Sequence, residues 1–193
     1  MTANKYDYEK YKEILKKMLS PKRFNHSVNV AAVAEDLAKH YGLDPEKAKI
    51  AGLLHDICKE MPDEENEKLI PKDVKKRICS PKILHGPAAG EYIKNKFKIT
   101  DEEVLNAVKY HTVGRKSMST FEKIISIADY TSPERKWGDV SKTRELAYKD
   151  LDLAMLKKVS TEIVAYVQKG LQVSPDTAEA YNYLISNCKG DKK

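Results

Sequence analysis

Residues 50–59, IAGLLHDICK, place a histidine and an aspartate directly after an apolar run that is typical of a buried helix. A second apolar run, IISIA at residues 124–128, is followed at once by Asp129. A carboxylate that is buried without a partner costs several kcal/mol or is forced to take up a proton. Asp56 and Asp129 therefore need a cationic partner. A metal ion would satisfy both, and neutral imidazoles would complete its coordination.

Apolar residues recur with helical spacing along nearly the whole chain, and no segment shows the alternation that is typical of a strand. Capping residues, Gly and Pro separate the periodic segments. Helices are expected at about 6–19, 20–41, 44–59, 63–69, 71–79, 86–97, 100–111, 120–131, 150–169 and 174–188. No repeat, low-complexity segment or linker interrupts them. The sequence therefore predicts an all-α fold in a single domain over residues 1–193, with a disordered tail at about 189–193.

Composition excludes several classes of protein. The 193 residues are 33% charged and 41% hydrophobic, which supplies a core under a charged surface. No apolar run approaches the ~20 residues that a bilayer requires, and charges interrupt the N-terminal segment as they would not in a signal peptide. Three cysteines without a CxxC pair argue against a disulfide scaffold and a thiolate zinc site. We expect a cytoplasmic protein without membrane partners.

The basic surplus does not predict a nucleic-acid partner. The net charge of +6 is the small difference between 35 Lys and Arg and 29 Asp and Glu. Clustered basic residues with interleaved aromatic residues, which nucleic-acid binding would favour, are not found. Lysine-rich stretches such as residues 72–77 are more often solvated helix faces. A small-molecule partner is expected instead.

Four of the five histidines lie in apolar helical settings. His26 shares a helical stripe with Val30 and Val33, His55 ends the apolar run quoted above, and His111 closes the stripe of residues 104 and 108. One buried histidine alone is usually a hydrogen-bonded core residue. Several of them together with two buried carboxylates favour a metal site. His40, beside Lys39 and Tyr41 near a helix end, is expected on the surface.

The order His26, His55-Asp56, Asp129 resembles the H…HD…D signature of the HD-domain metal-dependent phosphohydrolases. His85 and His111 match the additional pair in the six-ligand members that bind two metals. More narrowly, the chain resembles the bacterial YqeK-type proteins, which are symmetrical diadenosine tetraphosphate hydrolases. The strings that carry this resemblance span residues 23–184: RFNHSVNVA, AGLLHDICKE, ILHGPAAGEY, AVKYHTVGR, IADYTSPER and SPDTAEAYNYL. The resemblance implies a helical HD-domain bundle.

The resemblance also implies a division of the six ligands between two divalent or trivalent metal ions. One ion would be held by His26, His55, Asp56 and Asp129, and the second by His85 and His111 with Asp56 as a bridge. Two ions roughly 3.5–4 Å apart can hold and activate a water molecule. The family points to iron, whereas a His and carboxylate set also suits manganese, zinc or nickel.

Further residues are expected to contact a polyphosphate substrate. Asp56 and Lys59 are predicted to be catalytic. The predicted substrate contacts are Arg23, His26, Lys59, His85, Thr112, Arg135, Gly170, Leu171 and Pro175. Two alternatives stay open: Lys59 is an ordinary solvated lysine at a helix end, and residues 170–175 are an ordinary loop between helices.

The expected function is symmetrical cleavage of diadenosine tetraphosphate to two ADP, by attack of a metal-bound hydroxide on an inner phosphorus. One alternative is an HD phosphohydrolase for another nucleotide, either a nucleotidase or a cyclic-dinucleotide phosphodiesterase, although the chain lacks the GYP-containing extension typical of cyclic-di-GMP phosphodiesterases. A third hypothesis is a nucleotide sensor without turnover. The sequence leaves a homodimer open.

Overall fold

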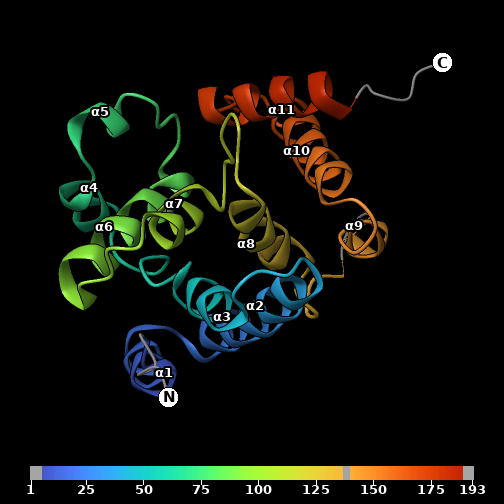
Figure 1. The fold of residues 1–193 in the computed structure, drawn as a ribbon. Coiled ribbons are helices and arrows are strands. Elements are labelled where there is room, and N and C mark those ends of the chain that lie inside the picture. Colours follow the sequence, from blue (N-terminus) through green and yellow to red (C-terminus); the bar gives the residue numbers. More distant parts are fainter. Residues whose placement is uncertain (1–5, 137–139, 189–193) are drawn as a thin grey trace.

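Helix α8 (Thr120–Thr131) crosses the middle of the molecule, and helices from both before and after it in the chain pack against it (Figure 1). The structure is a computed structural model that describes residues 6–136 and 140–188. Helices α2 (Pro21–His40) and α3 (Pro45–Leu54) cover one side of α8, and α7 (Glu102–Tyr110) and α10 (Leu151–Gln168) cover others. Within the described residues there is no strand, which confirms the predicted all-α class.

The remaining elements complete the shell around these helices. Helix α1 (Tyr8–Met18) packs on α3, and α6 (His85–Phe97) packs on α7. Helix α11 (Pro175–Asn187) lies on α10 at the C-terminal end of the molecule (Figure 1). The short elements are α4 (Asp63–Leu69), α5 (Lys72–Lys75), the 3₁₀ helix η1 (Pro81–Ile83) and α9 (Val140–Leu146).

Capping chemistry places most helix starts where the sequence predicts them. Ser20 caps α2 ahead of Pro21, and Asp44 caps α3 ahead of Pro45, each with its side chain accepting a backbone N–H three residues later. At α7 the cap is Asp101, and the helix begins at Glu102, two residues after the start expected at about 100. The expected helix at 71–79 is reduced to α5, and α9 was not expected.

One helix end differs from the prediction in a way that matters for the site. The sequence predicts a helix from about 44 to 59, but α3 ends at Leu54. The next residues form tight turns, in which the N–H of Ile57 donates to the carbonyl of Leu54 and the N–H of Lys59 to that of Asp56. The His-Asp pair thus lies on a turn and not on a regular helix.

Small residues bring α2 and α3 close together. Ala31, Ala34 and Ala38 on α2 are fully buried, and Gly52 of α3 packs against the α2 backbone. A Cβ added at Gly52 would lie 3.0 Å from the Cα of Ala31 and 3.0 Å from a backbone oxygen. This close approach holds His26 of α2 opposite His55 at the end of α3.

The apolar interior is continuous. Buried side chains of α1, α2, α3, α6, α7, α8, α10 and α11 belong to one hydrophobic cluster.

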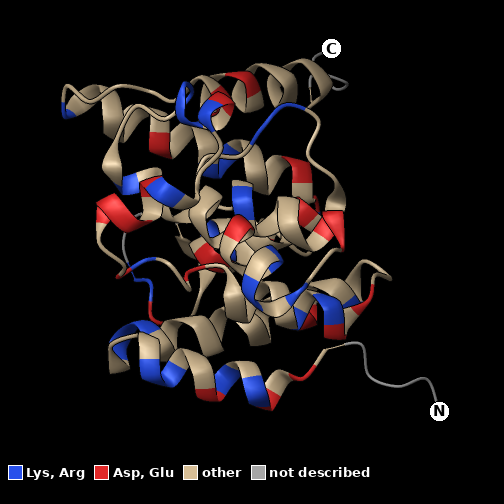
Figure 2. Ribbon diagram, turned by 90° about the vertical axis from the view of Figure 1, so that its left-hand side faces the viewer, with Lys and Arg blue, Asp and Glu red and all other residues tan. Residues whose placement is uncertain are grey.

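No helix in the described part of the chain is long and apolar enough to cross a bilayer. Figure 2 shows basic and acidic residues on helices across the molecule. The single domain over residues 1–193 stays a prediction, and the predicted tail at 189–193 lies outside the described residues.

Replacing Gly52 with alanine should destabilise the protein because the new methyl group meets backbone atoms of α2. We expect a loss of about 1–3 kcal/mol in the free energy of unfolding, measured by urea denaturation. Gly90→Ala in α6 is the matched control. Its Cβ would meet neighbours at 3.5 Å or more, an ordinary contact, and alanine favours the helix by up to about 1 kcal/mol. Equal stability of the two variants would contradict the close packing of α2 on α3.

Candidate metal centre

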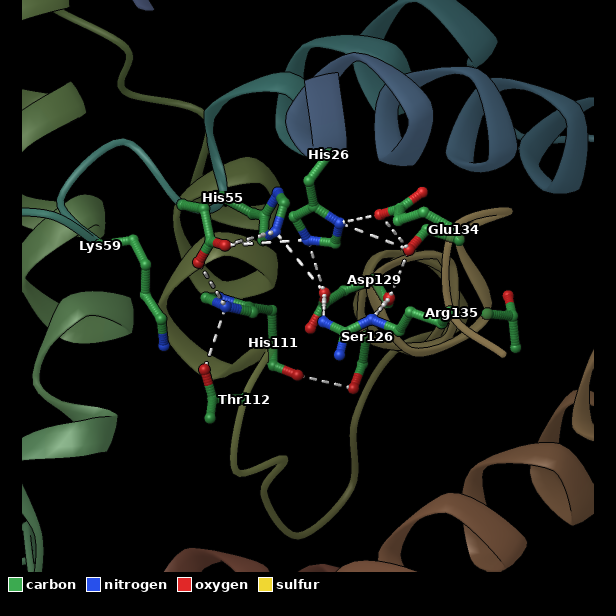
Figure 3. Close-up of polar contacts among 12 residues, drawn as sticks. His26, His55, Lys59, His111, Thr112, Ser126, Asp129, Glu134 and Arg135 are labelled. Atoms are coloured by element: carbon green, nitrogen blue, oxygen red, sulfur yellow. Dashed lines mark hydrogen bonds and ion pairs between the residues drawn. The ribbon is translucent and has the colours of Figure 1, made fainter. Parts of the chain in front are cut away.

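Five elements bring the six predicted metal ligands to one place. His26 comes from α2, His55 and Asp56 from the turn after α3, and Asp129 from α8. His85 begins α6, and His111 directly follows α7. All of them line or adjoin a cavity of about 680 Å³, and only Asp129 is more than marginally exposed. Figure 3 shows His26, His55, His111 and Asp129 converging on one place.

Asp56 lies between two pairs of histidines and directs one carboxylate oxygen toward each. Its Oδ1 is 3.2 Å from Nε2 of His85 and 3.6 Å from Nε2 of His111. Its Oδ2 is 3.4 Å from Nε2 of His55 and 3.8 Å from Nε2 of His26. This arrangement is the one that a carboxylate bridging two cations requires.

The backbone orients two of the imidazoles. Nδ1 of His55 lies 2.7 Å from the carbonyl oxygen of Gly52, and Nδ1 of His111 lies 2.7 Å from that of Val108. A carbonyl only accepts, so each Nδ1 carries the proton and donates it. Nε2 is then left with its lone pair toward Asp56, as a metal ligand needs.

The donor set fits metal ions. His26, His55 and Asp129 form one group whose ligand atoms lie within 4.8 Å of one another, and His55, Asp56 and His111 form another. Nε2 of His55 is buried and makes no hydrogen bond. Burying such a lone pair is unfavourable unless something binds it. The chemistry of this set, imidazole with carboxylate and no thiolate, suits iron, manganese, zinc or nickel.

The electrostatics keep both carboxylates and the His111 imidazole in metal-binding form, whereas they favour protonation of His55 in the absence of a cation. Burial alone would raise the pKa of Asp56 and of Asp129, but the neighbouring histidines, and Arg135 beside Asp129, hold both pKa values well below the usual range. Burial lowers the pKa of His111 to about 4, so its imidazole is neutral at physiological pH. Burial opposes a charge on His55, yet the two carboxylates outweigh it and raise its pKa.

Glu134 is a residue of the candidate site that the sequence does not identify. Its carboxylate binds Nδ1 of His26, and it accepts hydrogen bonds from Asn29 at 2.8 Å and from Ser132 at 2.8 Å. Together they hold His26 with Nε2 turned to Asp129, 3.0 Å away (Figure 3). Glu134 lies beside Arg135 in the SPER string, but its position in the sequence gives no sign that it contacts His26.

Three helices fix the turn that carries His111. Ser126 of α8 donates to the carbonyl of His111 at 2.8 Å, and Lys158 of α10 donates to that of Thr112 at 3.2 Å. Thr177 of α11 donates to the carbonyl of Val113 at 3.0 Å. Three successive carbonyls at the end of α7 are thereby satisfied by buried side chains. Helices remote in sequence thus set the position of a candidate metal ligand.

The predicted phosphate contacts lie around the same cavity. Arg23 donates to Oδ2 of Asp56 at 2.7 Å, and Arg135 donates to Oδ1 of Asp129 at 2.6 Å. Nζ of Lys59 lies 3.2 Å from Nδ1 of His85, and burial lowers the pKa of this lysine. The hydroxyl of Thr112 is 3.0 Å from Nε2 of His111. All four side chains line the cavity.

The other three predicted contacts lie elsewhere. Gly170 and Leu171 belong to an exposed connection between α10 and α11, Pro175 is the exposed first residue of α11, and none of the three lines the cavity. Gly170 has a φ of 65°, which suits the left-handed turn that ends α10. Contact of this segment with the substrate therefore stays a prediction.

Replacing Glu134 with alanine should weaken metal binding because His26 loses the partner that orients it. We expect a loss of about 10–100-fold in affinity for Mn²⁺, measured by isothermal titration calorimetry. Glu145→Ala, at an exposed position of α9, is the control and should bind Mn²⁺ like the unchanged protein. Unaltered affinity in a folded Glu134→Ala protein would contradict the orienting role.

Comparison with known proteins agrees with this geometry. Residues 23–134 match the HD domain family. The symmetrical bis(5'-nucleosyl)-tetraphosphatase of Bacillus subtilis is 34% identical over 89% of this chain and 94% of its own. The enzyme of the same name from Staphylococcus aureus is 37% identical over 91% and 93%.

A solved structure is similar throughout its length. The crystal structure of a predicted HD superfamily hydrolase involved in NAD metabolism, from Clostridium acetobutylicum, matches with a TM-score of 0.88 and 38% identity. The match covers 95% of this chain and 100% of that one. The chain therefore belongs to the HD domain family and, within it, to the group that contains the bacterial symmetrical bis(5'-nucleosyl)-tetraphosphatases.

Proposed function

We propose that the protein hydrolyses diadenosine tetraphosphate symmetrically to two molecules of ADP. The observation that carries the proposal is the bridging position of Asp56 between two histidine pairs, at the base of a cavity lined by cationic side chains. Relatives that share nearly the full length of the chain are named for this activity. The geometry and the family thus support the same class of reaction.

Six residues would hold two metal ions in this proposal. His26, His55 and Asp129 would bind one ion, His85 and His111 the other, and Asp56 both. Such a pair lowers the pKa of a bound water and neutralises charge on phosphate oxygens. We propose iron as the metal and the cytoplasm as the place of action. Manganese, zinc and nickel also suit the ligands.

The cationic side chains would bind and orient the polyphosphate. Around the candidate centre, Arg23 lies beside Asp56 and Arg135 lies beside Asp129. Lys59 lies beside His85. A guanidinium fork matches phosphate oxygens, and the hydroxyl of Thr112 supplies a further donor. Since Asp56 and Arg23 already form an ion pair, the carboxylate also orients the arginine. These residues would hold one inner phosphorus next to the metal centre.

The reaction needs little help from an acid. The oxygen of water forms a bond to one inner phosphorus, and the bond from that phosphorus to the central bridging oxygen breaks. The bridging oxygen leaves as part of ADP, and the proton lost from water passes to solvent. A terminal phosphate has a pKa of about 6, so the leaving group is stable without protonation. Positioning and charge neutralisation are the main demands on the protein.

Product analysis tests the proposal. Protein loaded with iron under anaerobic conditions should convert diadenosine tetraphosphate to ADP as the sole nucleotide product, followed by anion-exchange chromatography. ATP with AMP would contradict symmetrical cleavage. No product from protein shown to hold two metal ions would contradict the proposed substrate. A panel of other nucleotides and cyclic dinucleotides would then separate a different phosphohydrolase from a sensor without turnover.

His111→Ala should remove one of the two metal ions and lower turnover by at least about 100-fold, because a direct ligand matters more than an orienting neighbour. Metal content is measured by elemental analysis and folding by circular dichroism. His40→Ala is the matched control, since His40 is exposed and contacts only Tyr41 and Tyr148 among aromatic rings. Two metal ions and full turnover in His111→Ala would refute the two-metal assignment.

A further inference from the structure

We propose that Glu162 of α10 recognises the nucleoside end of the bound nucleotide by accepting a hydrogen bond from a ribose hydroxyl or a base amino group. The inference rests on the proposed function for the identity of the ligand as a nucleotide. It assigns a specificity-determining residue on a helix that lies outside residues 23–134, the part that matches the HD domain family.

Glu162 is the one carboxylate of the cavity wall, within the described residues, that has no task in the metal centre or at a helix end. Five carboxylates line the cavity: Asp56, Glu60, Asp129, Glu134 and Glu162. Asp56 and Asp129 belong to the metal centre, and Glu134 holds His26. Glu60 accepts hydrogen bonds from the backbone N–H and the hydroxyl of Ser20, at the start of α2.

Lys158 holds Glu162 in place. Nζ of Lys158 lies 3.0 Å from Oε2 of Glu162 and also donates to the carbonyl of Thr112. The lysine is 1% exposed, so its ammonium group is confined between these two acceptors. The Glu162 side chain is 23% exposed and faces the cavity. Among the described residues, Oε1 of Glu162 makes no hydrogen bond, which leaves it as a fixed acceptor.

The chemistry of the carboxylate selects its ligand. An ionised carboxylate only accepts hydrogen bonds, and phosphate oxygens near neutral pH also accept and carry negative charge. Glu162 therefore disfavours a phosphate group beside it. The hydrogen-bond donors of a nucleotide are its ribose hydroxyls and the amino group of its base. The cationic side chains take the phosphates, and Glu162 is suited to the nucleoside that follows them.

Direct binding of the product nucleotide tests this role without any need for turnover. The probes are ADP, 2'-deoxy-ADP, 3'-deoxy-ADP, IDP and pyrophosphate, titrated calorimetrically into Mn²⁺-loaded protein. Glu162→Ala should lower the affinity for ADP by about 10-fold or more, because a hydrogen bond to a charged group is lost. The affinity for pyrophosphate should not change. For the one analogue that lacks the donor, Glu162→Ala and the unchanged protein should bind with equal affinity. If that analogue is a deoxynucleotide, the donor is a ribose hydroxyl; if it is IDP, the donor is the amino group of the base.

A second variant guards against the unpaired charge that Glu162→Ala leaves on Lys158. Glu162→Gln keeps an acceptor for Lys158, because its amide oxygen takes the place of Oε2, and it presents an NH₂ donor where Oε1 accepted. It should also weaken the binding of ADP and leave that of pyrophosphate unchanged. Thr161→Val is the matched control on α10, because the Thr161 hydroxyl bonds only within its own helix, to the carbonyl of Lys157. It should bind every probe like the unchanged protein.

Two results for a Glu162→Ala protein that keeps its metal ions would overturn the proposal. One is an equal loss of affinity for ADP and for pyrophosphate, and the other is an unchanged affinity for ADP. Failure of the proposed function looks different. In that case the unchanged protein would bind ADP with the Glu162-dependent pattern but would not cleave diadenosine tetraphosphate.

Discussion

The buried carboxylate of Asp56 is the interaction on which the rest of the site depends. Its two oxygens lie 3.2–3.8 Å from the Nε2 atoms of four histidines that come from α2, α6 and the ends of α3 and α7. An isolated carboxylate at this depth would be strongly unfavourable. The surrounding imidazoles, Arg23 and the metal ions proposed here make it favourable. Packing that moved any one of these elements would leave the charge uncompensated.

The fold satisfies this constraint with backbone groups as much as with side chains. Because α3 ends at Leu54, the His55-Asp56 pair lies on a turn, and the carbonyl of Gly52 fixes the His55 ring. The turn after α7 is held in the same way, by hydrogen bonds from α8, α10 and α11 to three consecutive carbonyls. Rigid attachment of this kind is what keeps ligand atoms in place when a cation is bound or exchanged.

The cavity combines two parts of the chain with different tasks. Residues 23–134, which match the HD domain family, supply the metal centre, Arg23, Lys59 and Thr112. Helix α10 adds Lys158, which supports the Thr112 turn, and Glu162, which lines the cavity wall. A shared centre with a separately supplied wall is a simple way for related phosphohydrolases to differ in substrate while they keep the same chemistry.

The helices could be predicted from sequence because they depend on short-range pattern, and the six candidate metal ligands because their motifs resemble those of the HD domain family. Helical spacing and caps such as Ser20 and Asp44 act within a few residues, and most of the candidate ligands stand out as polar residues among apolar neighbours. Only the tertiary structure decided the partners of those ligands. Glu134 reaches His26, and Lys158 reaches Thr112, across 108 and 46 residues, and such contacts leave no local periodicity. The same holds for residues 170–175, since only the packing of α10 and α11 determines where this segment lies relative to the cavity.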